Sequence, residues 1–367
     1  MWWITLMRRT RFVLGSIVTW VIAVGFVTLL LRGQGLDLSV LPGLPLVVGI
    51  ALGLLGALYE LFWLPRIVHR LTSRGMFLGR TLFYAGAAGV AVTVLSALAA
   101  SAEFDLPLRT VLAAPVYHEM IGGRLFWTVI GLLALASVWI NYTRQVRLML
   151  GPGTLRALLF GRYARPVPEE RVFLFADLTD STGIAERLGP ALFNQFKNDF
   201  FYDVSEPVLA TRGQIYQYVG DEVVVTWPVR KGRATGNALQ AFALLENHLT
   251  ADRARYEARY GVAPTFKAGI HVGPVVTAEV GDLKKDIVHS GDTVNAASRI
   301  VGQCRKLDAR LLVSEAAMQL LETPDGLTLE RLGPVALRGR GETIVLFRAA
   351  LPSLVTPEPV KEEALTA

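Results

Sequence analysis

Two aspartates in the second half of the chain interrupt strand-like sequence. Asp177 directly follows the apolar run V-F-L-F-A, and Asp221 lies in Y-V-G-D-E-V-V-V, where a hydrophobic stretch bends at Gly220. If the two strands lie side by side, both carboxylates meet at one rim of a sheet. Hard oxygen ligands placed close together bind a divalent cation such as Mg²⁺, while phosphate oxygens and water complete its coordination. The two aspartates are therefore candidate metal ligands.

The residues after Asp177 predict the start of a helix. In D-L-T-D-S-T, the polar residues Asp180, Ser181 and Thr182 supply a turn and an N-cap ahead of the helical stretch G-I-A-E-R-L. Free backbone N–H groups and the positive end of the helix dipole suit a triphosphate. A metal beside a helix terminus indicates a nucleotide site, with Thr182 as a candidate substrate contact.

A second polar pair lies in H-S-G-D-T-V-N-A-A-S-R-I. Asn295 and Arg299 are four residues apart, so they project from one face of the helix that this stretch predicts. An amide and a guanidinium can hold a ribose and neutralise charge that develops on a phosphoryl group. Asn and Arg on a helix surface are commonly only solvated, so the pair alone is weak evidence for a site and becomes stronger evidence together with the two aspartates.

The elements that position these side chains alternate between strand-like and helix-like segments over residues 171–350, which is typical of a mixed α/β domain. We expect, in chain order, a strand ending at residue 177, a helix to about 208, a hairpin over 215–227, a helix over about 234–260, strands over 265–272 and 275–280, and then the helix that carries Asn295.

Residues 171–350 resemble the catalytic domain of class III adenylyl and guanylyl cyclases. The resemblance rests on five pieces in family order: F-A-D-L-T-D-S-T, Y-V-G-D-E-V-V-V, A-G-I-H-V-G-P-V-V, G-D-T-V-N-A-A-S-R and L-R-G-R-G-E. It implies an α+β, ferredoxin-like βαββαβ domain that converts ATP to 3′,5′-cyclic AMP and pyrophosphate.

The resemblance also implies roles for single residues. By position it assigns the two aspartates to a pair of Mg²⁺ or Mn²⁺ ions and the Asn295–Arg299 pair to the transition state, and it places Arg338 or Arg340 near the triphosphate. The family works as a head-to-tail homodimer, in which the metal aspartates of one subunit face the Asn and Arg of the other. One chain alone is therefore expected to be inactive.

The positions that would read the base depart from the family pattern. Adenylyl cyclases usually have Lys and guanylyl cyclases Glu where this chain has Gln217, whose amide can both donate and accept hydrogen bonds. Adenylyl cyclases usually have Asp or Thr where this chain has Val288, which can pack against a base; its backbone, His289 or Ser290 could read the base instead. ATP is the expected substrate, with a guanylyl or dual-specificity cyclase as the alternative.

Other classes of protein stay open at this point. A catalytically inactive sensor or partner subunit would usually have lost an aspartate or Arg299, and all are present. A diguanylate cyclase shares the core topology, but Val219 and Val223 replace the Gly and Phe of its turn. A transporter or receptor with an incidental soluble domain would need polar residues along a permeation path, and the apolar part of this chain has few.

The first part of the chain has a different composition. The chain is 52% hydrophobic, above the norm for soluble proteins, and the excess lies before about residue 143. Four stretches of about 20 residues are long enough to cross a bilayer: 12–31, 44–64, 81–100 and 125–142. We expect an all-α membrane bundle over 1–142, a helical connector over 143–170, the catalytic domain over 171–350 and a disordered, Pro-rich tail over 351–367.

Basic residues predict how the bundle lies in the membrane. They gather before the first stretch, between the second and third, and after the fourth: Arg8, Arg9, Arg11, Arg66, Arg70, Arg74, Arg80, Arg144 and Arg147. Because Lys and Arg in short loops stay inside the cell, both termini and the catalytic domain are expected in the cytoplasm of a bacterial cell, with the chain multi-pass in the inner membrane.

The same basic residues bear on partners. The net charge of +6 is explained by anionic membrane lipid beside these residues. The sequence has no basic face with interleaved aromatics, so nucleic acid is not expected as a partner. The ligand of the membrane part is not indicated by the sequence. Glu60, at the end of the second stretch, is expected to snorkel toward the headgroups beside Arg66, and the single cysteine, Cys304, excludes an intrachain disulfide.

Overall fold

The computed structural model describes residues 2–33, 43–63, 73–151, 154–337 and 343–350. Arg66, Arg70, Arg338, Arg340 and the predicted tail therefore lie outside the described residues. The chain divides into two compact units, Met1–Met149 and Leu150–Ala367, and each is described by itself.

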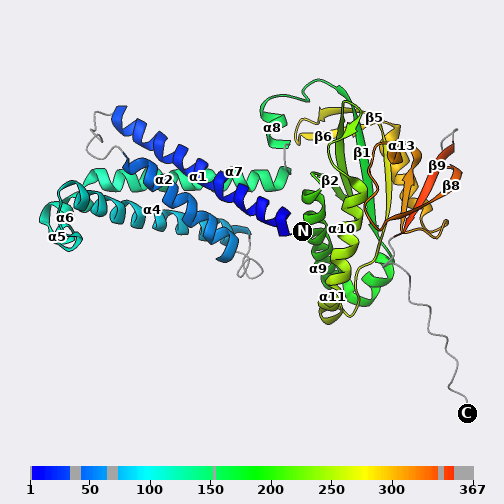
Figure 1. Cartoon of the computed structure of the whole chain (residues 1–367), viewed down its shortest axis with the longest axis horizontal. Helices are drawn as coiled ribbons and strands as arrows, with labels where there is room; N and C mark the ends of the chain where they lie inside the picture. The colour runs from blue at the N-terminus through cyan, green and yellow to red at the C-terminus, as the bar shows by residue number, and fades with distance from the viewer. Residues whose placement is uncertain (1, 34–42, 64–72, 152–153, 338–342, 351–367) are drawn as a thin grey trace, which may run out of the picture. The chain divides into compact units, whose positions relative to one another are not determined.

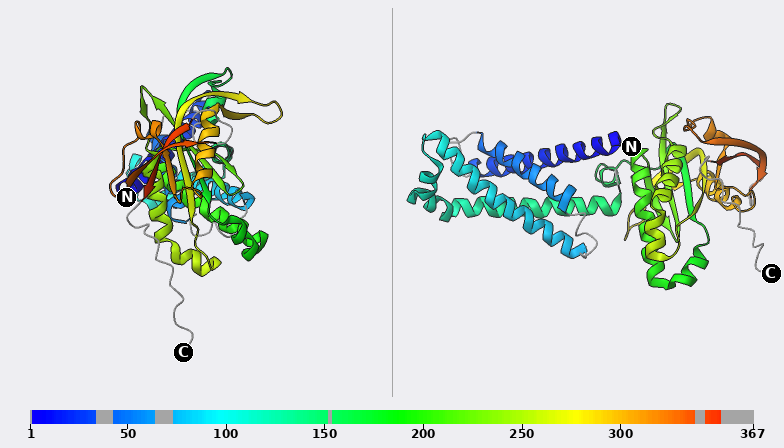
Figure 2. Two further views of the ribbon diagram at one scale, coloured as in Figure 1. Left: turned by 90° about the vertical axis from the view of Figure 1, so that its right-hand side faces the viewer. Right: turned by 60° about the horizontal axis from the view of Figure 1, so that its bottom comes forward.

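The first unit is all helical, as predicted (Figures 1 and 2). Its helices are α1 (Trp2–Gly33), α2 (Leu44–Leu58), the π-helical turn η1 (Tyr59–Trp63), α4 (Ser73–Glu103), α5 (Leu108–Ala113), α6 (Pro115–Gly122) and α7 (Arg124–Leu150). Four stretches are long and apolar enough to cross a membrane: Phe12–Gly33, Leu44–Trp63, Gly75–Glu103 and Arg124–Arg147. The prediction of four long apolar helices is confirmed.

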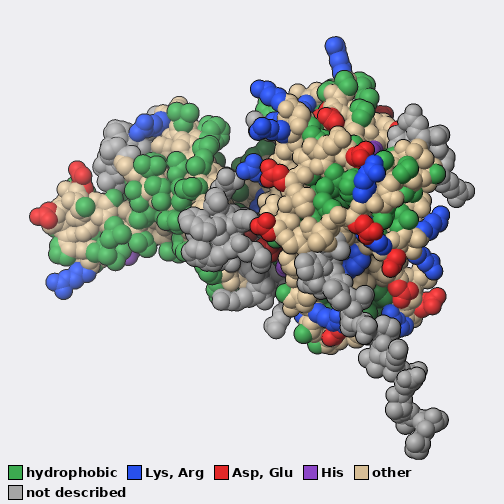
Figure 3. All heavy atoms as spheres, turned by 45° about the vertical axis from the view of Figure 1, so that its right-hand side comes forward, with side chains coloured by type: hydrophobic (Ala, Val, Ile, Leu, Met, Phe, Trp, Pro, Cys, Tyr) green, Lys and Arg blue, Asp and Glu red, His purple; other side chains and the backbone are tan. Residues whose placement is uncertain are grey.

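The surface of this unit supports a lipid environment. Large apolar side chains are exposed along all four long helices, for example Ile22, Leu54, Leu82 and Leu135. Figure 3 shows hydrophobic side chains over much of the visible face of the helices, with charged ones toward their ends. Exposed apolar area of this extent is unfavourable in water, so the four helices form a candidate multi-pass membrane segment.

Small residues let α1 and α2 approach closely. A Cβ atom on Gly49 would lie 2.7 Å from the Cα of Val21, and one on Gly53 would lie 2.4 Å from the Cα of Ile17. The hydroxyl of Ser16 donates to the carbonyl oxygen of Gly53 over 3.0 Å. Gly49 and Gly53 form a G-x-x-x-G pattern, which packs helix backbones together where lipid gives no hydrophobic driving force.

Glu60 does not snorkel toward the headgroups, so that interpretation is wrong; Arg66, its expected neighbour, lies outside the described residues. Its side chain is 3% exposed and forms ion pairs with Arg80 of α4 over 3.2 Å and with Arg144 of α7 over 2.5 Å. The Arg144 guanidinium also lies 5.0 Å from the ring centroid of Phe12 on α1. Since a buried carboxylate is costly unless it is paired, the two arginines account for Glu60 and join three helices at one end of the bundle.

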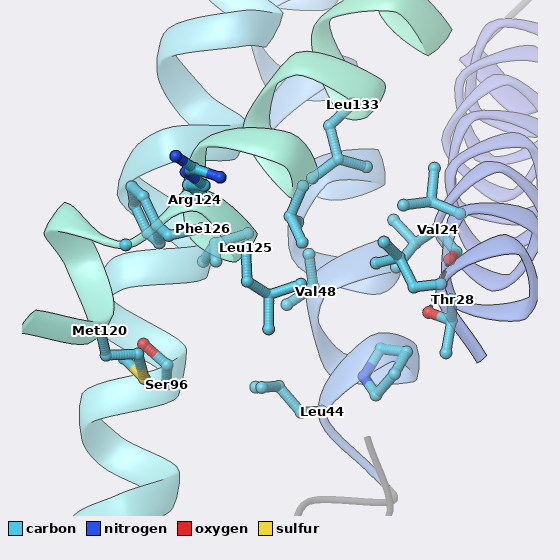
Figure 4. A pocket seen from close by; sticks show the side chains of 16 residues that line it. Val24, Thr28, Leu44, Val48, Ser96, Met120, Arg124, Leu125, Phe126 and Leu133 are labelled. Carbon is cyan, nitrogen blue, oxygen red and sulfur yellow. Dashed lines mark hydrogen bonds between the residues drawn. The ribbon is translucent and has the colours of Figure 1, made fainter. Parts of the chain in front are cut away.

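The bundle also contains a partly open pocket of about 470 Å³ (Figure 4). Valine, leucine and phenylalanine side chains from α1, α2, α4 and α7 make up most of its wall. The wall's hydroxyl groups are already used, because Thr28 donates to the carbonyl oxygen of Val24 and Ser96 to that of Thr93. Arg124, the first residue of α7, brings a cation to this mostly apolar space.

The second unit is a mixed α/β domain. Its elements are α8 (Thr154–Leu159), β1 (Val167–Leu178), α9 (Ser181–Ala210), β2 (Gln214–Val219), β3 (Glu222–Arg230), β4 (Arg233–Ala234), α10 (Ala238–Ala251), α11 (Arg253–Tyr260), β5 (Phe266–Val280), β6 (Asp286–Ser290), α12 (Asp292–Gln303), β7 (Leu311–Ser314), α13 (Glu315–Met318), β8 (Thr328–Ala336) and β9 (Thr343–Ala350). The sheet order is β2-β3-β1-β5-β7-β9-β8, with β4 on β3 and β6 on β5. The segment from β1 to β5 has the predicted βαββαβ order, and this prediction is confirmed.

Both faces of the sheet are buried, which explains the continuous apolar run in β1. Val172, Leu174 and Ala176 join the core that α9, α10 and α11 cover, whereas Phe173 and Phe175 join the core under α12. Figure 1 shows α9, α10 and α11 gathered beside the sheet. A strand with apolar residues on both sides has no alternation, as expected for a central strand between two helical layers.

Two boundary predictions within this unit are wrong. The strands expected at 265–272 and 275–280 form one strand, β5, that passes through Pro274 without a break. Proline is tolerated there because it falls between the β7 pairing, which ends at Ile270, and the β6 pairing, which begins at Val276. The helix expected at 234–260 is two helices, because the chain leaves helical geometry at Asp252 (φ −92°, ψ 6°).

Candidate active site

The end of β1 and the β2–β3 turn meet at one rim of the sheet. Asp177 pairs with Glu222 of β3 on one side and with Lys267 of β5 on the other. Asp221 precedes Glu222 in the turn, whose Gly220 has a φ of 62° that favours glycine. The structure therefore brings Asp177 and Asp221 to the same rim, as their places in the sequence suggested.

The rim carries crowded negative charge. Burial raises the pKa of Asp177, the Lys267 ammonium group 3.0 Å away lowers it, and the charge of Asp221 raises it again, so that the pKa lies above its ordinary value. Burial, followed by the charges of Asp177 and Asp221, raises the pKa of Glu222 to about 7. A bound cation would relieve this repulsion, and carboxylate oxygens are the ligands that Mg²⁺ and Mn²⁺ prefer. The residues present fit a divalent metal.

The start of α9 lies close to this rim in the sequence. Asp180 occupies the N-cap position with left-handed backbone angles (φ 56°, ψ 34°), but its side chain makes no capping hydrogen bond. Its carboxylate lies 3.7 Å from the guanidinium of Arg187 instead. Asp180 is thus the N-cap residue, as predicted, but it makes no side-chain bond there, and the first N–H groups of α9 keep their capacity to bind a ligand. Thr182, in the first turn, is exposed.

Asn295 and Arg299 both lie on α12. The buried face of this helix consists of Thr293, Ala296, Ala297, Ile300 and Val301, so Asn295 is exposed and Arg299 is half-buried. Their spacing puts both side chains on neighbouring turns of one face.

Asn295 lies at the end of α12 that is remote from the aspartates, and the helix then runs back along β5, where a Cβ atom on Gly269 would meet the backbone nitrogen of Val301 at 2.6 Å. A Cβ atom on Gly273 of β5 would meet Thr293 at 2.7 Å, which places the start of α12 six residues along β5 from Lys267, the partner of Asp177. At about 3.3 Å per strand residue and about 1.5 Å per helix residue, Asn295 lies roughly 15 Å or more from Asp177 along the strand. Within one chain, Asn295 is therefore separated from Asp177.

The two candidate base-reading residues lie on strands that approach each other. Gln217 is exposed on β2 opposite Val224, and Val288 is half-buried on β6 opposite Ala278. The residues next to them, Tyr216 and His289, form a ring pair with centroids 4.7 Å apart. The structure thus brings the segments of Gln217 and Val288 together within one chain.

A third group of titratable side chains lies between α9, α10 and α11. Ligand atoms of Asp203, His248 and Asp252 are within 4.8 Å of one another. The Arg255 guanidinium, however, lies 2.6 Å from Asp203 and 2.9 Å from Asp252, and the Tyr256 hydroxyl donates to Asp203 over 2.6 Å. Because a cationic side chain already neutralises these carboxylates, the contacts fit an ion pair between helices better than a metal site.

Sequence reasoning missed Lys267 and the partners of His289. Lys267 is a polar residue in an apolar strand, which is a weak signal, and only the β1–β5 register shows that it faces Asp177. His289 was a candidate reader of the base, but it is buried and its Nδ1 atom lies 2.8 Å from the hydroxyl of Thr277.

Comparisons with known proteins identify the second unit. Residues 167–348 match the Adenylate and Guanylate cyclase catalytic domain. Adenylate cyclase 2 of Rhizobium meliloti (strain 1021) is 37% identical over 215 residues, which are 59% of this chain and 59% of that protein. Adenylate cyclase 1 of the same organism is 29% identical over 184 residues, which are 49% of this chain and 27% of that protein. The chain thus spans less than two thirds of either relative.

The fold comparison points the same way. A solved structure of a bacterial light-regulated adenylyl cyclase aligns with a TM-score of 0.52 at 18% identity, over 62% of this chain and 67% of that one. At this identity the alignment shows a shared fold. Together with the family match over residues 167–348, it shows that the second unit of this chain is a catalytic domain of the class III adenylyl and guanylyl cyclase family, preceded by a helical region with four long apolar helices.

Proposed function

We propose that this protein converts ATP to 3′,5′-cyclic AMP and pyrophosphate at two composite sites of a homodimer. The observation that carries the proposal is the rim at which Asp177, Asp221 and Glu222 crowd beside Lys267. Crowded carboxylates next to a helix terminus suit a metal-bound triphosphate, and membership in the cyclase family implies a nucleotide substrate.

Asp177 and Asp221 are the residues that would hold Mg²⁺ or Mn²⁺. Two such ions per site, when bound, would neutralise the triphosphate and make the α-phosphate more electrophilic. Lys267, 3.0 Å from Asp177, balances part of the carboxylate charge before the substrate arrives.

The remaining steps follow from the chemistry of the chain's own groups. The N–H groups at the start of α9 and the hydroxyl of Thr182 bind phosphate oxygens, and Asn295 holds the ribose so that its 3′ oxygen faces the α-phosphorus in line. The 3′ hydroxyl oxygen forms a bond to the α-phosphorus and loses its proton to water, the bond from the α-phosphorus to the bridging oxygen breaks, and pyrophosphate leaves with the electron pair. Arg299 stabilises the added charge on the α-phosphoryl oxygens. Arg338 or Arg340, outside the described residues, is expected near the triphosphate.

Dimerisation is part of the proposal because one chain separates Asn295 from Asp177. Asn295 lies roughly 15 Å or more from Asp177 along β5, by the strand and helix rises that relate them. In a head-to-tail pair with two-fold symmetry, the rim of one subunit faces α12 of the other, and the pair contains two identical sites.

ATP as substrate is supported by the relatives, of which the first two are described as adenylate cyclases. The exposed amide of Gln217 can donate to and accept from either purine, so a guanylyl or dual-specificity cyclase is the second candidate.

Base choice can be tested at Gln217. In a competition assay with equal ATP and GTP, we expect cyclic AMP to predominate. The variant Gln217→Lys should raise the ratio of cyclic AMP to cyclic GMP and Gln217→Glu should lower it, each by about tenfold, because one side chain only donates and the other only accepts. Gln214→Lys, on the same strand, is unsuitable as a control because Gln214 binds Arg171; Gln240→Lys on α10 serves instead. Equal product ratios in all variants would remove Gln217 from base recognition.

We also propose that the four long helices cross the inner membrane with both termini in the cytoplasm. The basic residues of the sequence support this orientation, and anionic lipid would lie beside them. In sealed cells, an external protease should cleave a protease site inserted at residues 104–106, between α4 and α5, and should spare the catalytic domain. Cleavage of the catalytic domain by the external protease under the same conditions would show the opposite orientation.

A further inference from the structure

Beyond the proposed site residues, we propose that Thr277 and His289 are positioning residues that hold the base-reading strands β2 and β6 in place through a buried hydrogen-bond chain. The inference rests on the proposed cyclase function. The family match gives no role to either residue, and the sequence offered His289 only as a candidate reader of the base.

The hydrogen-bond chain begins at a buried arginine. Arg171, 2% exposed, donates from Nη1 to Oε1 of Glu169 over 2.9 Å, from Nε to Oγ1 of Thr226 over 3.0 Å and from Nη2 to Oε1 of Gln214 over 2.6 Å. Glu169 also accepts from the hydroxyl of Thr277 over 2.6 Å. These bonds join β1, β2, β3 and β5 at the end of the sheet opposite to Asp177.

Thr277 connects this network of hydrogen bonds to β6. It is fully buried, and its Oγ1 lies 2.6 Å from Oε1 of Glu169 and 2.8 Å from Nδ1 of His289. A threonine hydroxyl has one proton, and the Glu169 carboxylate can only accept, so the proton points to Glu169. The bond to His289 must then run the other way, from a protonated Nδ1 to the hydroxyl oxygen. The chain therefore fixes the tautomer of His289.

The charges along the chain agree with this assignment. Burial acts to raise the pKa of Glu169, but the Thr277 hydroxyl and the Arg171 guanidinium outweigh it and lower the pKa below its ordinary value, so Glu169 is an acceptor. Burial and then the positive charge of Arg171 lower the pKa of His289 to about 4, so its ring is neutral near pH 7. A neutral ring with a proton on Nδ1 is the form that the geometry requires.

His289 then ties β6 to β2, two strands that do not pair in the described sheet. Its backbone N–H donates to the hydroxyl oxygen of Tyr216 over 3.2 Å, and its ring lies 4.7 Å from the Tyr216 ring and 5.7 Å from the Phe173 ring. Tyr216 precedes Gln217, and Val288 precedes His289. The hydrogen bonds that fix the His289 ring therefore also fix the spacing of Gln217 and Val288, the two candidate base-reading residues.

The test removes the hydroxyl at Thr277 with little change of shape. Purified full-length protein would be assayed with ATP, and then with inorganic tripolyphosphate as a competitive inhibitor that lacks a base. In Thr277→Val, we expect the KM for ATP to rise about tenfold, because Glu169 loses a bond and His289 Nδ1 loses its acceptor, while kcat changes less than about threefold. The inhibition constant of tripolyphosphate should stay within about twofold of wild type, because the phosphate site is not altered.

Two comparisons separate positioning from a general loss of stability. Thr277→Ser keeps the hydroxyl and should restore the wild-type KM. Thr211→Val removes another buried hydroxyl, one that donates to Pro207 at the end of α9, and should leave KM unchanged. If Thr277→Val fails to fold, two variants of His289 replace it. His289→Asn keeps a donor at the place of Nδ1 and should keep the KM for ATP near that of wild type, whereas His289→Leu has no donor there and should raise it.

The outcomes also separate this inference from the proposed function. A wild-type protein that makes no cyclic nucleotide would reject the function itself. The positioning role alone would be overturned if the wild type is active and Thr277→Val keeps the wild-type KM for ATP. It would also be overturned if Thr277→Val raises the inhibition constant of tripolyphosphate as much as the KM for ATP.

Discussion

Replacing Asp177 by asparagine is expected to lower cyclase turnover about a thousandfold or more. The change keeps the size of the side chain but removes the charge that would bind a metal, and the metal supplies most of the neutralisation of the triphosphate in the transition state. Asp221→Asn should have a similar effect, because Asp221 lies at the same rim and its charge acts on Asp177. Turnover would be measured at saturating ATP and Mn²⁺ on the purified full-length protein.

A matched control lies three residues away. Asp180 is also an aspartate near the end of β1, but it is exposed and paired with Arg187, so Asp180→Asn should keep turnover within about threefold of wild type. Calorimetric titration with Mn²⁺ should show weaker binding to Asp177→Asn and unchanged binding to Asp180→Asn. Full turnover in Asp177→Asn, or an equal loss in Asp180→Asn, would contradict the assignment of the metal ligands.

Mixing two inactive variants should restore activity if each site is shared between subunits. In a heterodimer of Asp177→Asn and Arg299→Ala chains, one site carries both defects and the other carries neither. Random pairing of equal amounts makes about half of the dimers mixed, each with one intact site of two, so about a quarter of wild-type activity should return. The assay compares each variant alone with the mixture after dissociation and reassociation in detergent.

The control for this experiment uses two defects on the same half. Asp177→Asn mixed with Asp221→Asn leaves every composite site with a damaged rim, so no activity should return. Recovery in this mixture, or no recovery with Arg299→Ala when light scattering confirms mixed dimers, would contradict the shared site.

The main features of the candidate site could be predicted from the sequence because they depend on local signals. Asp177 ends an apolar run, Asp221 sits in a hairpin turn, and Asn295 and Arg299 are one helical turn apart. Strand pairing then had to place the first two at a common rim, and the register of β1 with β3 does so. The four long apolar helices were predictable for a similar reason, since length and composition alone identify them.

The remaining features depend on contacts between residues far apart in the chain. Lys267 reaches Asp177 only through the register of β1 with β5, and Glu60 is neutralised by Arg80 and Arg144 on two other helices. Sequence patterns predict that a charge in such a place needs a partner, but they do not say which partner. The chain from Arg171 to His289 is of the same kind, because it crosses strands whose order in space differs from their order in the sequence.

The most direct test of the central claim is the product that the purified full-length wild type makes from ATP in the presence of Mn²⁺ or Mg²⁺, identified by mass and counted against released pyrophosphate. The account predicts 3′,5′-cyclic AMP and pyrophosphate in equal amounts, and no product when the divalent ions are removed with a chelator. A confirmed dimer that makes no cyclic nucleotide from ATP or GTP would contradict it and would leave a catalytically inactive partner subunit as the better description.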